Sequence, residues 1–108
     1  MTTIVVERRI AADHPAFAGH FPGRPVLPGV VLLTEVLQAI QAVPEMVVAI
    51  GSEPVLAAAK FLTPVRGACC LRIGLRLAAG ALAFEVSVDE TVVAKGHYQA
   101  HTERISAR

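Results

Sequence analysis

The stretch PGVVLLTEVLQAIQAVP, residues 28–44, decides the fold of this 108-residue chain. Pro28 suits the first turn of a helix, because the amides there have no partner within the helix, and Pro44 stops it. The residues between them predict one long helix that ends at about Val43. We expect polar residues on one side of it and apolar residues over most of the remainder: Thr34, Glu35, Gln38 and Gln41 against Val30, Val31, Leu33, Leu37 and Ile40. A helix so apolar must be wrapped by another element, most simply by a curved sheet.

Strands are predicted on both sides of this helix. Residues 4–11 alternate and predict one strand before it, with Ile4, Val6 and Ile10 on one face. After Pro44 each apolar run is interpreted as a strand: residues 46–50, 54–62, 69–77, a run containing Phe84, Val86 and Val88, and residues 92–101, with turns at Ala79-Gly80 and Asp89-Glu90. Leu71, Ile73, Leu75 and Leu77 should point inward. One helix on an antiparallel sheet is an α+β protein.

Composition narrows the class of protein. The chain is 54% apolar and 18% charged, which excludes intrinsic disorder, and its length predicts a single domain over residues 1–108 with a frayed tail at 102–108. A net charge of +1, without basic clusters among aromatic residues, argues against nucleic-acid binding. The longest apolar stretch is too short to span a membrane, and no signal peptide is visible, so we expect a cytoplasmic protein. The surplus of Ala and Val indicates a subunit interface, and we expect at least a dimer.

No metal or cofactor site is predicted. Cys69 and Cys70 are adjacent, so in a strand they should face opposite ways and stay reduced. His97 and His101 would lie about 13 Å apart in a strand, too far to share an ion. The cysteines and histidines therefore lack any zinc-binding spacing.

The loop before the helix carries the candidate chemistry. Residues 13–28 contain four prolines and two glycines, which excludes regular helix or sheet there. His20 lies in this stiff loop, and an imidazole can accept a proton near neutral pH. The loop leads into a helix start, where free amides stabilise a negative oxygen. This combination suits removal of a proton next to a carbonyl, with the enolate oxygen held by the amides.

The segment GHFPGRPVLPGV, residues 19–30, resembles the active-site motif of the 3-hydroxyacyl-acyl-carrier-protein dehydratases of fatty acid synthesis. A second similarity to this family lies in KFLTPVRG, residues 60–67. The resemblance implies a hotdog fold, in which a curved antiparallel sheet wraps a long helix and two sheets join edge to edge in a dimer. It implies a 3-hydroxyacyl thioester substrate on the phosphopantetheine arm of acyl carrier protein. His20 would be the catalytic residue, Gly29 and Val30 would polarise the thioester carbonyl, Phe21 would contact the substrate, and water would leave to give a trans-2-enoyl product.

One position departs from the family. Its acidic helix residue falls at Thr34, and the nearest carboxylate, Glu35, is about 100° further round the helix. Three accounts stay open. In the first, Glu35 reaches the site or Thr34 positions a water, and the chain is a slower dehydratase. In the second, this chain supplies His20 to a homologous partner that supplies the acid. Or the pocket only binds acyl thioesters or hydrolyses them, with Glu35 activating water. Five cations are candidates for contacts to an acidic carrier protein: Arg24, Lys60, Arg66, Arg72 and Arg76.

Overall fold

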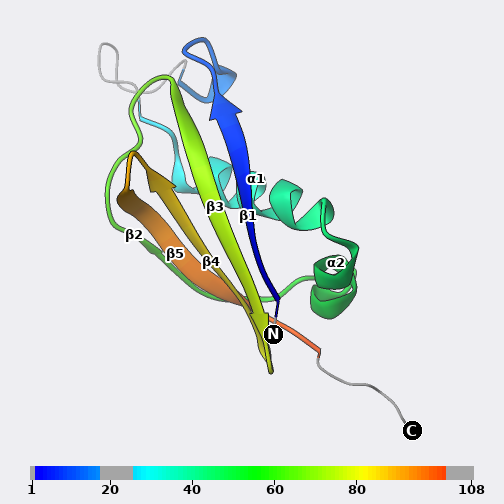
Figure 1. Ribbon diagram of the computed structural model, residues 1–108. Coiled ribbons are helices and arrows are strands. Elements are labelled where there is room, and N and C mark those ends of the chain that lie inside the picture. Colours follow the sequence, from blue (N-terminus) through cyan, green and yellow to red (C-terminus); the bar gives the residue numbers. More distant parts are fainter. Residues whose placement is uncertain (1, 18–25, 102–108) are drawn as a thin grey trace, which may run out of the picture.

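The computed structural model describes residues 2–17 and 26–101. In these ranges a five-stranded antiparallel sheet is packed against helix α1, with a second helix, α2, beside it (Figure 1). The strands lie in the order β1-β3-β4-β5-β2. The elements are β1 (Thr2–Ile10), the 3-10 turn η1 (Pro15–Phe17), α1 (Gly29–Gln41), α2 (Pro44–Ile50), β2 (Leu56–Phe61), β3 (Cys69–Ala78), β4 (Ala81–Val88) and β5 (Thr91–Gln99).

Strands β3, β4 and β5 form the predicted meander. The turn that joins β3 to β4 contains Gly80 with a positive φ of 79°, a conformation that glycine adopts without strain. Asp89 and Glu90 join β4 to β5, also with positive φ, as tight hairpins require. The predicted inward residues Leu71, Ile73 and Leu75 are fully buried. Strands β1 and β2, far apart in the sequence, close the two edges of the sheet.

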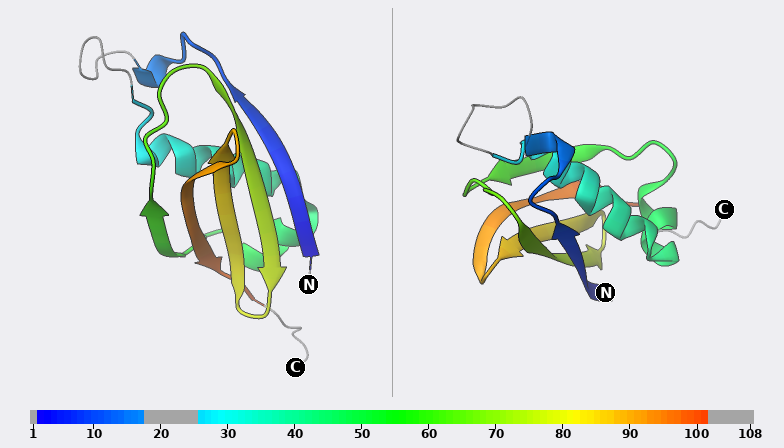
Figure 2. Two further views of the ribbon diagram at one scale, coloured as in Figure 1. Left: turned by 60° about the vertical axis from the view of Figure 1, so that its left-hand side comes forward. Right: turned by 90° about the horizontal axis from the view of Figure 1, so that it is seen from above.

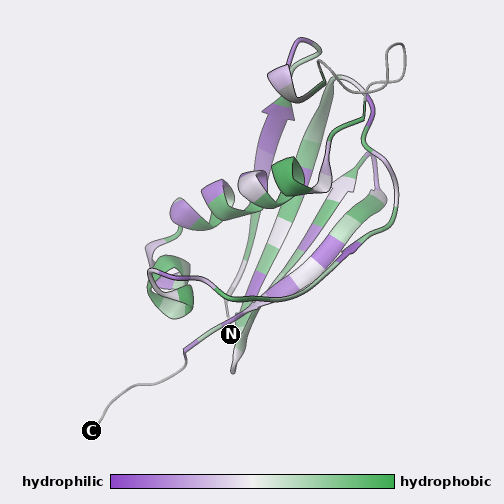
Figure 3. Ribbon diagram, turned by 180° about the vertical axis from the view of Figure 1, so that it is seen from behind, coloured by the Kyte–Doolittle hydropathy of each residue, from purple (hydrophilic) through white to green (hydrophobic). Residues whose placement is uncertain are grey.

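The sheet curves around α1, as seen from above in Figure 2. Viewed from behind, α1 crosses the strands on one face of the sheet (Figure 3), and it buries Leu32, Val36, Ala39 and Ile40 against them. The predicted helix is confirmed, but the predicted division of its faces is partly wrong. The side chain of Glu35 is only 12% exposed, whereas Val30 is 69% exposed. Glu35 can turn toward the sheet because β1 offers it a cationic partner, described below.

The predicted strand at 46–50 is wrong, because these residues belong to α2. Met46, Ala49 and Ile50 are buried, and their spacing of three and four residues is that of one helix face. Pro44 ends α1, yet it also suits the first turn of a new helix. A short apolar run does not by itself distinguish a strand from a buried helix.

The remaining boundaries agree with the predictions to within a few residues. The Pro/Gly-rich loop contains a single 3-10 turn, η1, in its described part. The predicted frayed tail, residues 102–108, lies outside the described residues. Within residues 2–17 and 26–101 no single helix could cross a membrane by length and apolarity; α1 and α2 pass that test only as a pair, and the pair is bent by 118°.

Candidate active site at the start of helix α1

The start of α1 is fixed by the segment that follows β2. The N–H of Leu27 donates a hydrogen bond of 2.8 Å to the C=O of Val65, and both side chains are buried. The ring of Phe61 lies against Gly29 so closely that a Cβ there would be 2.8 Å from its Cζ atom. Glycine therefore allows the aromatic ring to approach the helix start. The structure thus places residues 26–30, the described end of the first stretch that carried the resemblance, beside residues 60–67, which form the second.

The first amides of α1 are free of partners within the helix. Pro28 precedes the helix in an extended conformation and makes no side-chain cap. The first turn is closed by N–H groups of Val31 and Leu32, which both donate to the C=O of Pro28. The N–H groups of Gly29 and Val30 come before these bonds, so they have no acceptor in α1. Together with the helix dipole they can stabilise a negatively charged oxygen.

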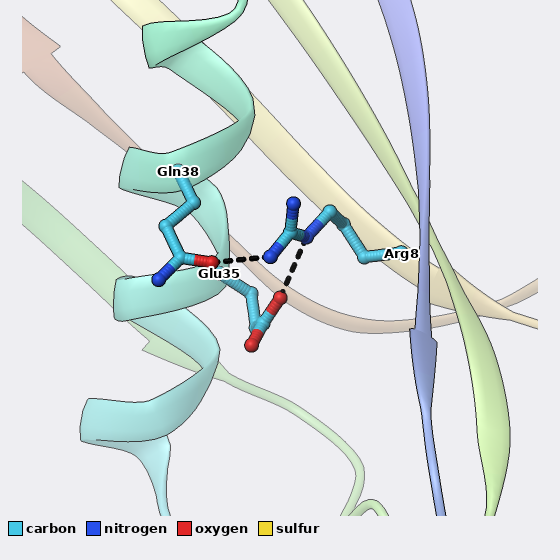
Figure 4. Close-up of polar contacts among 3 residues, drawn as sticks. All are labelled: Arg8, Glu35 and Gln38. Carbon is cyan, nitrogen blue, oxygen red and sulfur yellow. Dashed lines mark hydrogen bonds and ion pairs between the residues drawn. The ribbon is translucent and has the colours of Figure 1, made fainter.

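Thr34 and Glu35 are adjacent in α1 but have different surroundings. Thr34 is exposed, and its Oγ1 donates a hydrogen bond of 3.0 Å to the C=O of Val30, one turn earlier. Glu35 accepts a hydrogen bond of 2.7 Å from Nε of Arg8 in β1, and Arg8 also donates to Oε1 of Gln38 (Figure 4). The Glu35 side chain is 12% exposed and that of Arg8 34%. The carboxylate is therefore already paired, and the pair ties α1 to β1.

Sequence reasoning missed Arg8, although the sequence carried a signal. Arg8 falls on the same face of the first strand as Ile4, Val6 and Ile10, by strict alternation. A cation on the buried face of a strand requires a partner from the element packed on it. Glu35 on α1 is that partner.

Other predicted site residues fall elsewhere. His20, Phe21 and Arg24 lie outside the described residues, so the roles predicted for them stay predictions. Lys60 and Arg76 lie on the face of the sheet away from α1, while the guanidinium of Arg72 lies 3.5 Å from the Glu7 carboxylate. Among the described residues, no three His, Cys, Asp or Glu side chains come together in a way that could hold a metal ion.

A curved antiparallel sheet around one long helix defines a hotdog-fold protein, as predicted. The chain belongs to the ApeI-like dehydratase family, whose model, described as ApeI dehydratase, matches residues 1–97. It is similar to the 3-hydroxyacyl-[acyl-carrier-protein] dehydratase FabZ of Chlamydia trachomatis serovar L2, with 31% identity over 105 residues, 87% of this chain and 69% of the relative. FabZ of Herpetosiphon aurantiacus is 35% identical over 99 residues, which cover 82% of this chain and 70% of that protein.

Two solved structures share the fold. The dehydratase heterocomplex ApeI:P from Xenorhabdus doucetiae matches with a TM-score of 0.70 at 19% identity, over 91% of this chain and 86% of that one. An uncharacterized protein from Erwinia carotovora subsp. atroseptica matches with a TM-score of 0.74 at 25% identity, over 91% and 82%. The predicted family and the predicted fold are both confirmed.

Proposed function

We propose that this chain takes part in the dehydration of 3-hydroxyacyl thioesters carried on acyl carrier protein, in fatty acid synthesis or a related polyketide or pigment lipid pathway of the cytoplasm. The observation that supports the proposal is the arrangement of free amides at the start of α1. The loop that bears the His20 motif leads directly into it, and its free amides are held in place by Leu27 and Phe61.

The chemistry divides between a base, an oxyanion site and an acid. His20 removes a proton from C2 of the acyl group, and Gly29 and Val30 N–H groups hold the thioester oxygen as it becomes negative. Phe21 contacts the acyl chain. The electron pair left at C2 forms the double bond to C3, and the C3 hydroxyl leaves as water once an acid protonates it. The product is a trans-2-enoyl thioester.

The source of that acid is the open part of the mechanism. The pairing of Glu35 with Arg8 disfavours Glu35 as a freely acting acid, and also as the base of a thioesterase. Thr34 carries no carboxyl group, and in a homodimer both copies would have threonine at this position. We therefore favour the account in which a homologous subunit with Glu or Asp at this position completes the site across a dimer interface.

Hydration of a trans-2-enoyl thioester tests the proposal, because it runs the same chemistry in reverse and removes the ultraviolet absorbance of the conjugated enoyl group. We expect His20→Ala to abolish hydration with the fold retained. His97→Ala, a histidine on the helix-free face, is the matched control and should leave hydration unchanged. Full activity of His20→Ala would contradict the mechanism.

The supply of the acid is tested separately. The chain alone is expected to be slow, since loss of a general acid costs about 10²- to 10⁴-fold. Thr34→Glu should restore at least about 10²-fold of that rate, as should mixing with an acid-bearing homologous subunit. Release of free thiol from an acyl thioester, without enoyl hydration, would instead assign the chain as a thioesterase. If neither reaction occurs even in the mixture, the chain is a non-catalytic binding subunit.

A further inference from the structure

Two apolar side chains beside the free amides of α1 are exposed. Phe61, the last residue of β2, is 50% exposed, and Val30 of α1 is 69% exposed. In Figure 2 the end of β2 lies next to the start of α1. The far end of the Phe61 ring meets the backbone of Gly29: its Cζ, Cε1 and Cε2 atoms lie 2.8, 2.9 and 3.1 Å from the place that a Cβ would take. The rest of the ring surface stays open to whatever binds at the amides.

The sheet holds Phe61 in place behind this contact. Phe61 pairs with Ala94 of β5, which is buried, so its ring points to the face of the sheet that carries α1. Directly after β2, the N–H groups of Leu62 and Thr63 both donate to the C=O of Val93, at 2.9 and 3.4 Å. Strand β5 therefore fixes the backbone on both sides of the ring, and the ring passes that position on to the start of α1.

Stability alone favours neither member of this contact. Alanine forms helices better than glycine, by up to about 1 kcal/mol, yet alanine at residue 29 would collide with the ring. Phenylalanine stabilises a protein mainly through burial, and Phe61 is only half buried. Departures from local preference are expected where a residue serves a functional site. The contact between Phe61 and Gly29 is therefore better explained by the amides of the site than by the stability of the fold.

We propose that Phe61 is a positioning residue for the dehydration, which sets the direction of the Gly29 N–H toward the thioester oxygen. This inference rests on the proposed function. An amide donor stabilises a developing negative charge only when it points at the place that the oxygen will take. The open part of the ring, together with Val30, also covers the bound oxygen from water. The hydrogen bond to that oxygen is stronger there, because the local dielectric constant is lower.

Infrared spectroscopy of a bound thioester tests the proposal. The probe is a trans-2-enoyl thioester of N-acetylcysteamine, labelled with carbon-13 at the carbonyl and added to the full chain. Amide donors that polarise a carbonyl lower its stretching frequency, so the wild type should shift the band below that of the free probe. We expect Phe61→Ala to lose at least about half of that shift. Leu62→Ala is the matched control, because Leu62 is the next residue and is 47% exposed, and it should keep the full shift.

A double-mutant cycle locates the effect in the contact itself. Gly29→Ala keeps the N–H donor, but its Cβ would lie 2.8 Å from Cζ of Phe61 and so displaces the ring. We expect Gly29→Ala and Phe61→Ala each to lower kcat for enoyl hydration about tenfold, less than the 10²- to 10³-fold typical of a lost donor. KM should change less than about threefold. The double variant should also lose about tenfold, because both changes remove the same contact.

Three results would overturn the proposal: a full carbonyl shift in folded Phe61→Ala, an equal loss of the shift in Leu62→Ala, or losses of kcat that multiply in the double variant. Circular dichroism shows that each variant is folded, and Phe61→Leu replaces Phe61→Ala if the latter does not fold. The infrared result decides if turnover of the chain is too slow to measure. Absence of any shift in the wild type would contradict the proposed function as well, whereas a wild-type shift that Phe61→Ala retains contradicts only the role of Phe61.

Discussion

Replacing Arg8 and Glu35 with leucine, singly and together, measures the strength of the ion pair between β1 and α1. Either single variant leaves a partly buried charge without its main partner. Breaking a fully buried pair costs about 3–5 kcal/mol, whereas an exposed pair is worth about 0.2–1 kcal/mol. With side chains 34% and 12% exposed, this pair lies between those limits. We expect each single variant to lose about 2 kcal/mol of unfolding free energy, with a coupling energy of about 1.5 kcal/mol.

The assay is urea unfolding of the wild type, the two single variants and the double variant, all at one protein concentration. A loss of about 2 kcal/mol corresponds to a Tm about 8–16 °C lower in a domain of this size. The Glu7–Arg72 pair is the matched control, because it joins the same strand β1 to β3 at 3.5 Å with side chains 64% and 61% exposed. Its coupling energy should be below about 0.5 kcal/mol. Equal coupling in the two cycles would refute the argument that burial strengthens the Arg8–Glu35 pair.

The same variants separate a structural role of Glu35 from a chemical one. If the carboxylate braces α1 and does not react, Arg8→Leu/Glu35→Leu restores a compatible apolar contact and retains enoyl hydration to within a few-fold. Glu35→Gln keeps an oxygen that can accept from Arg8. Loss of all turnover in a folded Glu35→Gln variant would show that the charge itself takes part in the reaction.

Three further predictions concern the sheet. Burial raises the pKa of Tyr98 above its ordinary 10.0, so the folded protein favours the protonated phenol. The free energy of unfolding should therefore fall as the pH rises above about 10. Tyr98→Phe should remove that fall in denaturation measured across this pH range. Gly96→Ala would place a Cβ 2.2 Å from the carbonyl oxygen of Ala58 and should lower the free energy of unfolding by more than about 2 kcal/mol. At Gly74 the nearest atom to an added Cβ is 3.8 Å away. Gly74→Ala should therefore change the free energy of unfolding by about 0.5 kcal/mol or less in the same urea assay. The pKa of Cys69 is raised by burial and by the nearby Cys70 and Asp89. A thiol-exchange reagent at about pH 8 should therefore react first with Cys70, which is exposed. Cys70→Ala should remove the fast phase of the thiol-exchange reaction.

The local pattern of apolar and polar residues was sufficient to predict most of the fold. The alternation of Leu71, Ile73 and Leu75 predicted their burial, and the two prolines around residues 29–43 bounded α1 nearly to its observed end. The hydrophobic pattern gave the wrong prediction at residues 46–50, because a run of five apolar residues is compatible with a buried helix as well as with a strand. There the structure chose a helix that buries Met46, Ala49 and Ile50 against the core.

By itself, the sequence determined the family and predicted where a candidate site lies, because the motifs at residues 19–30 and 60–67 are each contiguous in the chain. Only the tertiary structure decided which residues these two stretches, and the residues around them, contact. It placed Phe61 against Gly29, turned Glu35 toward Arg8 and gathered Lys60, Arg76 and Lys95 on the helix-free face. The physical reason is that strand order and register bring together residues from β1, β2 and α1 that are far apart in the chain, and no local spacing encodes that order.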